Sequence, residues 1–230
     1  MKTIGLLGGM SWESTVSYYR AINSGIKAQL GGLHSAKIAL FSVDFAEIET
    51  LQQQGDWHQA GVILEHAARA VEAAGADFFM IGTNTMHKVA DQVAAAVSIP
   101  LLHIADATAE RLKADGIDTV GLLGTRFTME QDFYKGRLAA HHGIRVLVPD
   151  ETDQSIVHRI IYDELCQGRV NDDSRQEYLK IITQLSSQGA QAVILGCTEI
   201  SLLVSQSDTS VPVYDTTAIH AAAAVNLALI

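Results

Sequence analysis

Three segments of this chain recur in the same order and at nearly the same spacing, and this duplication constrains the fold more than any other feature. Residues 75–84 (GADFFMIGTN) overlay residues 189–198 (GAQAVILGCT) without a gap. Two shorter segments recur on either side of that match: residues 4–9 as 120–125, and residues 99–102 as 211–214. The sequence therefore predicts two related halves, residues 1–115 and 116–230, with the C-terminal helix a candidate to complete the first half.

Each half alternates short apolar runs with longer helical patterns, which is typical of parallel sheets covered by helices on both faces. Strands are expected at residues 4–9, 37–43, 78–81, 99–104, 120–125, 193–196 and 211–214. Helices are expected at 12–30, 58–74, 83–97, 106–115 and 218–230, with residues 45–57 as a loop. The predicted fold is α/β with two pseudo-symmetric domains, and the active site is expected in the cleft between them.

Composition excludes several classes of function. The net charge of −10 argues against nucleic acid or an anionic membrane as partner. No apolar run reaches the roughly 18 residues of a membrane helix, and no signal peptide is evident. The two cysteines, Cys166 and Cys197, lack a metal-ligand spacing. We therefore expect a cytoplasmic protein without a metal.

Cys197 follows the run Val-Ile-Leu-Gly, so it is expected at the carboxyl end of a buried strand, where open α/β sheets bind ligands. The overlay places Thr83 at the matching position of the first half. A helix beginning beside Cys197 would lower the pKa of its thiol toward a usable thiolate, although a structural buried cysteine is the alternative. Cys166 falls at helical spacing and is interpreted as a core or surface residue.

Other candidate groups lie near these strand ends. His87 follows Thr83 by one helical turn and either assists its hydroxyl or simply packs in the core. His103 and Asp215 follow equivalent strands, as groups that support the site or as helix caps. The turn Gly5-x-x-Gly8-Gly9 lacks the G-x-G-x-x-G spacing of a dinucleotide site.

The motifs GTNT at 82–85, with His87, and GCTE at 196–199 resemble those of the aspartate/glutamate racemase superfamily. GGMSWEST at 8–15, followed by Tyr18-Tyr19, is similar to the signature of its aspartate racemase branch, with the enterobacterial L-aspartate/glutamate-specific racemases as the nearest group. The resemblance covers essentially the whole chain. It implies an isomerase that needs no cofactor such as pyridoxal phosphate, acts on a small amino acid and forms a homodimer.

In that family two acid/base groups act on opposite faces of the substrate α-carbon, which the resemblance transfers to Thr83 and Cys197. The family's first cysteine is replaced here by Thr83, a far weaker acid than a thiol. We therefore expect Cys197 to take the α-proton from L-substrate readily, and abstraction from D-substrate by Thr83 to be slow or absent. The substrate-binding residues are expected to be Met10, Gln52, Asn84, Thr85, Thr125 and Thr198.

The substrate side chain is less constrained. Family members specific for acidic substrates generally carry an arginine after the second strand and a lysine in the second half. Residues 44–58 contain no arginine, and residues 162–166 contain no lysine. Gln52 is then the polar candidate in the first half. Thr125, with Arg126, Thr128 and Lys135 nearby, could supply a partial replacement in the second half. Aspartate and glutamate remain the expected substrates; a broad-specificity racemase, a related single-cysteine decarboxylase and a non-catalytic amino-acid-binding protein are the alternatives.

Overall fold

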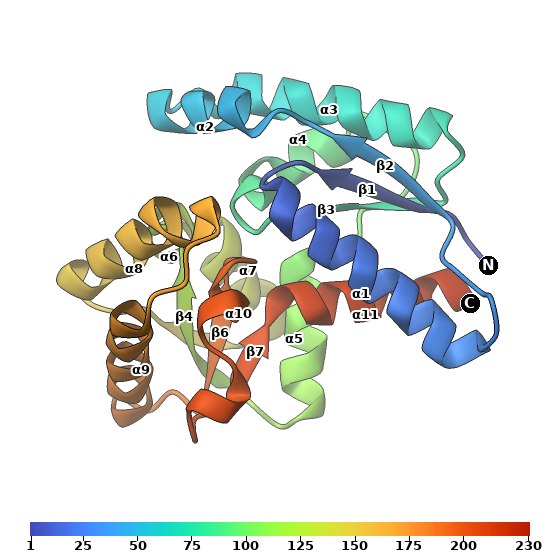
Figure 1. The fold of residues 1–230 in the computed structure, drawn as a ribbon. Helices are drawn as coiled ribbons and strands as arrows, with labels where there is room; N and C mark the ends of the chain where they lie inside the picture. The colour runs from blue at the N-terminus through green and yellow to red at the C-terminus, as the bar shows by residue number, and fades with distance from the viewer. The chain divides into compact units, whose positions relative to one another are not determined.

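The computed structural model describes all residues from 1 to 230 and consists of two parallel sheets, each flanked by helices (Figure 1). Contacts divide the chain into two compact units. One comprises residues 1–104 with 220–230, and the other comprises residues 105–219. The last helix, α11 (Thr216–Leu229), therefore contributes its C-terminal part to the first unit. None of the helices combines the length and apolar character needed to span a bilayer.

The first unit is built on the parallel strand order β2-β1-β3. Its strands are β1 (Ile4–Gly8), β2 (Ile38–Ser42) and β3 (Phe78–Ile81), and its helices are α1 (Trp12–Leu30), α2 (Phe45–Gln54), α3 (Trp57–Ala73), the 3₁₀ helix η1 (Thr85–Val89) and α4 (Ala90–Ala94). Alternate residues of β1 and β3 face opposite sides of the sheet. Leu7, Phe79 and Ile81 pack in a core with α3, whereas the other face packs against α1 and α11. Both faces are buried, as a continuous apolar strand requires.

The second unit has the parallel order β5-β4-β6-β7. Its strands are β4 (Thr119–Gly124), β5 (Arg145–Leu147), β6 (Ala192–Gly196) and β7 (Val213–Asp215). Its helices are α5 (Ile104–Ala114), α6 (Arg126–Glu130), α7 (Asp132–His142), α8 (Glu151–Asp163), α9 (Asp172–Ser187) and α10 (Ile200–Leu203), with 3₁₀ turns η2 (Leu165–Gln167) and η3 (Gln206–Asp208). Its described core joins β4 and β6 to α8 and α9.

The predicted duplication is present in the strand pairing. Gly5 of β1 lies beside Phe79 of β3, and Gly121 of β4 lies beside Val193 of β6. A Cβ atom on either glycine would come within 2.9 Å of a helix side chain, Val71 of α3 or Leu185 of α9. Both halves therefore use a glycine in the middle strand to bring one helix close to the sheet.

Three sequence predictions of secondary structure were wrong. Residues 45–54 form α2, because Asp44 caps the helix and Gly55 ends it in a left-handed conformation. Residues 83–97 are divided between η1 and α4. Residues 99–104 form only a bridge to Phe79, through bonds to Pro100 O and from Leu102 N, before α5 begins at Ile104.

Candidate active site

The residues expected at the site follow the carboxyl ends of central strands in both units. In the first unit, Met10 follows β1 and Thr83 follows its neighbour β3. Gln52 on α2 is at the same edge, because its Nε2 donates to Met86 Sδ at 3.1 Å, three residues beyond Thr83. In the second unit, Thr125 follows β4, and its chain neighbour Gly124 pairs with Gly196, which precedes Cys197. Each sheet edge therefore gathers the candidates of its own unit.

Cys197 and Thr198 both donate to the same carboxylate oxygen. Cys197 Sγ lies 3.0 Å and Thr198 Oγ1 lies 2.7 Å from Glu199 Oε2. Glu199 is 4% exposed, whereas Cys197 is half-buried. The strand end thus holds a thiol directly against a buried carboxylate. Sequence reasoning gave Glu199 no role, although its place two residues after the cysteine was the available signal.

The prediction that a helix start lowers the pKa of Cys197 was wrong. Burial raises the pKa of the Cys197 thiol well above its ordinary value, and the charge of Glu199 and the nearby Cys166 raise it further. Helix α10 has only four residues, so its dipole is small. The backbone N–H of Glu199 lowers the pKa of Cys197, but by less than burial and the Glu199 carboxylate raise it. The resting form is therefore the thiol, hydrogen-bonded to Glu199.

Cys166 lies in η2 and packs, partly buried, against the same core cluster as Cys197. Tyr178 is fully buried there, and its hydroxyl donates to Val157 O at 3.2 Å. Burial raises the pKa of Tyr178 well above its ordinary value, with Cys197 and Cys166 as further contributors. The surroundings of Cys197 thus disfavour added negative charge.

His87 contacts Thr83 through the backbone and not through the hydroxyl. Its Nδ1 lies 2.7 Å from Thr83 O, and its Nε2 lies 3.2 Å from Ile104 N. Burial lowers the pKa of His87 well below its ordinary value, and the neighbouring His103 and His220 lower it further. The hypothesis that His87 acts as a base on Thr83 is therefore not supported, because both ring nitrogens already have backbone partners.

The groups considered beside His87 have separate roles. The His103 ring packs against the His87 ring, with centroids 4.5 Å apart. Asp215 caps α11, where its Oδ1 accepts from Thr217 N at 2.8 Å and Ala218 N at 3.2 Å. Of the two interpretations weighed for Asp215, the helix cap is the one that the structure contains.

Polar groups suited to hold a substrate surround both strand ends. Asn84, Thr85, Thr125 and Thr198 are all buried, and Thr125 also caps α6. Gln52 is 4% exposed, and its Oε1 has no hydrogen-bond partner in the structure. Met10 packs in the same core cluster as Met86. The first-unit edge therefore offers a buried amide oxygen that can accept a hydrogen bond.

The two basic residues proposed as replacement ligands for a side-chain carboxylate are engaged elsewhere. Arg126 donates to Ser155 Oγ at 2.9 Å and forms an ion pair with Glu130 at 3.2 Å. Lys135 Nζ donates to Glu130 O at 2.8 Å. A metal site is not indicated either, since groups of three or more His, Cys, Asp or Glu in a metal-binding arrangement are absent.

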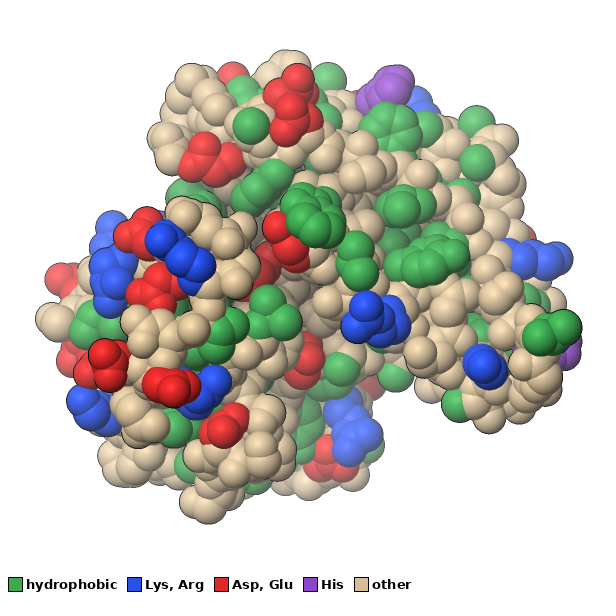
Figure 2. Space-filling view, viewed as in Figure 1, with side chains coloured by type: hydrophobic (Ala, Val, Ile, Leu, Met, Phe, Trp, Pro, Cys, Tyr) green, Lys and Arg blue, Asp and Glu red, His purple; other side chains and the backbone are tan.

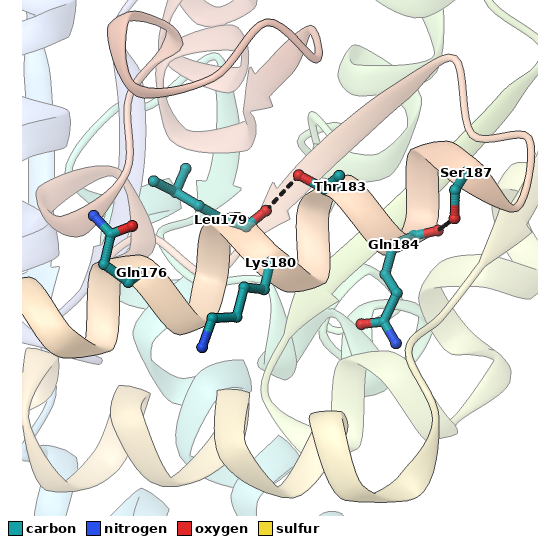
Figure 3. Close-up of a pocket in the computed structure, with 6 residues that line it drawn as sticks. All are labelled: Gln176, Leu179, Lys180, Thr183, Gln184 and Ser187. Carbon is teal, nitrogen blue, oxygen red and sulfur yellow. Dashed lines mark hydrogen bonds between the residues drawn. The ribbon is translucent and has the colours of Figure 1, made fainter.

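A surface depression of about 530 Å³ follows α9 and holds none of these groups. Figure 3 shows the side chains that line it: Gln176, Leu179, Lys180, Thr183, Gln184 and Ser187. Thr183 and Ser187 donate to carbonyls of their own helix, Leu179 O and Gln184 O. Because its two hydroxyls donate within their own helix and its lining holds no acid/base pair, this depression is not a candidate active site.

Known proteins share this fold. A Yersinia pestis protein provisionally assigned as an Asp/Glu racemase is 60% identical, with 100% of both chains covered and a TM-score of 0.94. An aspartate racemase homologue from Pyrococcus horikoshii is 35% identical, with 100% of both chains covered and a TM-score of 0.85. The broad specificity amino-acid racemase RacX of Bacillus subtilis is 23% identical over 160 residues, 68% of this chain and 66% of RacX, slightly less than two thirds of its length.

The family resemblance read from the motifs is confirmed at the level of the whole chain. Residues 7–224 match the family described as Asp/Glu/Hydantoin racemase. That range includes both matched strand ends and the N-terminal signature from Gly8 onward. The chain belongs to the Asp/Glu/Hydantoin racemase family and is an isomerase of the racemase kind.

Proposed function

We propose that this protein racemises free amino acids without a cofactor, with Cys197 taking the α-proton of the L-enantiomer and Thr83 serving the opposite face. One observation carries the proposal. Matching strand ends of a duplicated fold present a thiol bonded to a buried carboxylate in one unit and a hydroxyl in the other. Removing a proton from one face and returning one to the other needs two such groups.

The pair Cys197–Glu199 supplies the base in two proton steps. The thiol proton moves to Glu199 Oε2 along their 3.0 Å hydrogen bond, which leaves a thiolate and a neutral carboxylic acid. The thiolate then takes the α-proton, and the electron pair of the broken C–H bond remains on the substrate as a carbanion stabilised through its carboxylate. The α-ammonium charge of a bound amino acid favours the first step, because it offsets the negative charge forming on sulfur.

Thr83 completes the reaction by giving its hydroxyl proton to the opposite face of the carbanion and recovering a proton from water. The hydroxide formed from that water takes the proton held by Glu199, which restores the resting carboxylate beside the Cys197 thiol. Backbone and side-chain donors of Asn84 and Thr85, together with the backbone N–H of Thr198, hold the substrate carboxylate, where charge builds during proton removal; the Thr198 hydroxyl itself donates to Glu199. These residues are buried, so their hydrogen bonds act with little competition from solvent.

Aspartate and glutamate remain the first proposed substrates, on family grounds. A broader substrate range is the second candidate, and two observations favour it. Gln52 offers an uncharged amide where an arginine would bind a side-chain carboxylate, and Arg126 is engaged with other residues. In addition, RacX, a related protein, is described as a broad specificity amino-acid racemase.

The test is α-proton exchange in D₂O, followed by NMR and chiral chromatography, with no cofactor added. The substrates are both enantiomers of aspartate, glutamate, alanine, serine and glutamine. Cys197→Ala is expected to lose all exchange. Thr83→Ala is expected to lose inversion but keep exchange of the L-form, whereas Thr83→Cys restores a stronger acid and is expected to increase inversion.

The outcomes separate the alternatives. Exchange that survives in Cys197→Ala would contradict the proposed base. Exchange confined to neutral amino acids would favour the second candidate. Amino-acid binding by calorimetry with no exchange for any substrate would leave a binding protein, and CO₂ release from an aryl-substituted malonate would indicate a decarboxylase.

The predicted homodimer is also a proposal. Trp12, Val16 and Tyr19 recur at helical spacing on α1 and are 65%, 45% and 54% exposed. Figure 2 shows apolar side chains gathered on this face of the protein. An exposed apolar strip of this kind is typical of an interaction surface. Sedimentation of the wild type and of Trp12→Ser would test it: a dimer that dissociates in the variant supports the proposal, and a wild-type monomer contradicts it.

A further inference from the structure

His87 is bound at both ring nitrogens, and its partners fix which nitrogen carries the hydrogen. The backbone N–H of Ile104 can only donate, so Nε2 accepts at 3.2 Å. The remaining nitrogen, Nδ1, therefore carries the hydrogen and donates to Thr83 O at 2.7 Å. His87 is 3% exposed, so neither bond is exchanged for water. The neutral ring therefore links the Thr83 carbonyl to the Ile104 N–H at the start of α5, and we call this pair of hydrogen bonds the clamp.

His220 repeats this pattern beside it. Its Nε2 lies 2.9 Å from Leu102 O, an obligate acceptor, so its Nδ1 accepts from the Tyr18 hydroxyl at 3.0 Å. The His220 ring centroid lies 6.0 Å from the His87 ring centroid, and the His103 ring centroid lies 4.5 Å from it. Three packed rings, each nine-tenths or more buried, leave His87 little freedom to reorient.

The bond to Thr83 O determines the orientation of a peptide unit at the candidate site. The peptide between Thr83 and Asn84 is planar, and its C=O and N–H point in opposite directions. Holding the carbonyl against His87 therefore directs the Asn84 N–H away from the histidine rings. The same constraint fixes the backbone on which the half-buried Thr83 hydroxyl is carried.

We propose that His87 is a positioning residue for the Thr83 half-reaction: by clamping Thr83 O, it holds the Thr83 hydroxyl and the Asn84 N–H where the carbanion is reprotonated. This inference rests on the proposed racemase function. It also predicts that loss of the clamp slows inversion relative to the reaction at the Cys197 face. Cys197 belongs to the second unit and is held by Glu199, so the clamp does not position the base that acts on the L-enantiomer. A weaker hold on the substrate carboxylate through Asn84 would lower the reactions at both faces alike and cancel in their ratio.

Three substitutions separate the two bonds of the ring. His87→Asn retains an N–H where Nδ1 was and loses the acceptor for Ile104 N. His87→Gln reaches the Nε2 position with an acceptor oxygen and loses the donor to Thr83 O. His87→Ala removes both. His142→Ala is the matched control, because it removes a half-buried histidine of the second unit whose Nε2 lies 2.9 Å from Asp106 Oδ1.

The measurement is the ratio of two reactions on the same L-amino acid, chosen as the best substrate of the wild type. One is inversion, followed as D-product by chiral chromatography. The other involves only the Cys197 face and is followed as deuterium uptake with retention. Chloride elimination from L-3-chloroalanine, measured separately, reports on the same face as an independent check. In the elimination the α-proton goes to the thiolate, chloride leaves, and the aminoacrylate product hydrolyses to pyruvate and ammonia. Partial unfolding lowers both reactions equally and leaves the ratio unchanged.

We expect the ratio of inversion to one-face reaction to fall about tenfold or more in His87→Ala and His87→Gln, because small displacements of a reacting group cost this much. In His87→Asn the ratio should stay within about twofold of the wild type, since the bond to Thr83 O survives. A ratio that is unchanged in all three variants, or that falls equally in His142→Ala, would overturn the proposal. A wild type that performs neither reaction on any amino acid would instead refute the proposed function.

Discussion

His220 makes the stability of the first unit depend on pH. Burial lowers the pKa of His220 to about 4 from 6.5, the value that applies in the unfolded chain. Between pH 6.5 and 4 the unfolded chain binds a proton that the folded protein does not. The stabilisation is therefore complete above pH 6.5 and is lost as the pH falls toward 4. At 1.36 kcal/mol per pKa unit, the full loss is about 3 kcal/mol.

Intrinsic fluorescence reports on the relevant unit, because the chain has two tryptophans, Trp12 and Trp57, and both lie in it. Urea unfolding of the wild type and of His220→Gln would be compared from pH 7 to pH 4. Glutamine keeps an N–H for Leu102 O and does not titrate. Both proteins contain the same carboxylates, so the contributions of carboxylate titration cancel in the difference between their unfolding free energies. We expect the two free-energy curves to converge by about 3 kcal/mol on acidification. His66→Gln, at an exposed histidine of α3, should remain parallel to the wild type. Parallel curves for His220→Gln would refute the reasoning.

Two further predictions concern the second unit. In a Cys166→Ser background, Glu199→Gln removes the charge that adds to the effect of burial in raising the Cys197 pKa, so iodoacetamide should alkylate Cys197 about tenfold faster at pH 7.5. Racemisation should fall, because the acceptor of the thiol proton is lost. Unchanged alkylation would show that Glu199 does not control the thiol. Gly121→Ala places a Cβ 2.9 Å from Leu185 Cδ1 and should destabilise the protein by about 1–3 kcal/mol in urea unfolding followed by circular dichroism. Gly136→Ala is the control and should not destabilise the protein, because its added Cβ meets only the exposed Asp132. Equal stabilities of the two variants would contradict the close packing of α9 on β4.

The elements that sequence predicted best are those whose signals are local. Helix α1 begins and ends where expected, because Ser11 caps its first turn and Gly31, with φ of 74°, ends it. The duplicated strand pairing was predictable because apolar runs and glycines recur in register. Helix α2 was missed for the opposite reason. Its exposed face carries Glu47, Gln53 and Gln54, which form helices readily but resemble a loop when only polarity is considered.

The candidate site was predictable in its positions but not in its electrostatics. The strand ends located Cys197 and Thr83 because parallel strands present their carboxyl ends at one edge of a sheet. The direction of the Cys197 pKa shift depends on burial and on how Glu199 turns back toward the sulfur, and neither is encoded in residue spacing. For His87, spacing correctly placed it near Thr83 but could not tell that its partner is the carbonyl.

The replacement of a cysteine by Thr83 can alter this reaction only within a thermodynamic limit. The two enantiomers have equal free energies, so kcat/KM for inversion must be the same in both directions, whatever residue occupies position 83. A weak acid at Thr83 therefore slows abstraction from the D-enantiomer and proton return to that face by equal factors. The asymmetry appears in the fate of the carbanion, which takes a proton back from Cys197 more often than it receives one from Thr83. L-substrate in D₂O should consequently gain deuterium with retention, whereas D-substrate should gain it mainly on conversion to L. Deuterium uptake with retention at equal rates from both enantiomers would mean that Thr83 is as competent as the thiol, and the asymmetric assignment of roles would have to be abandoned.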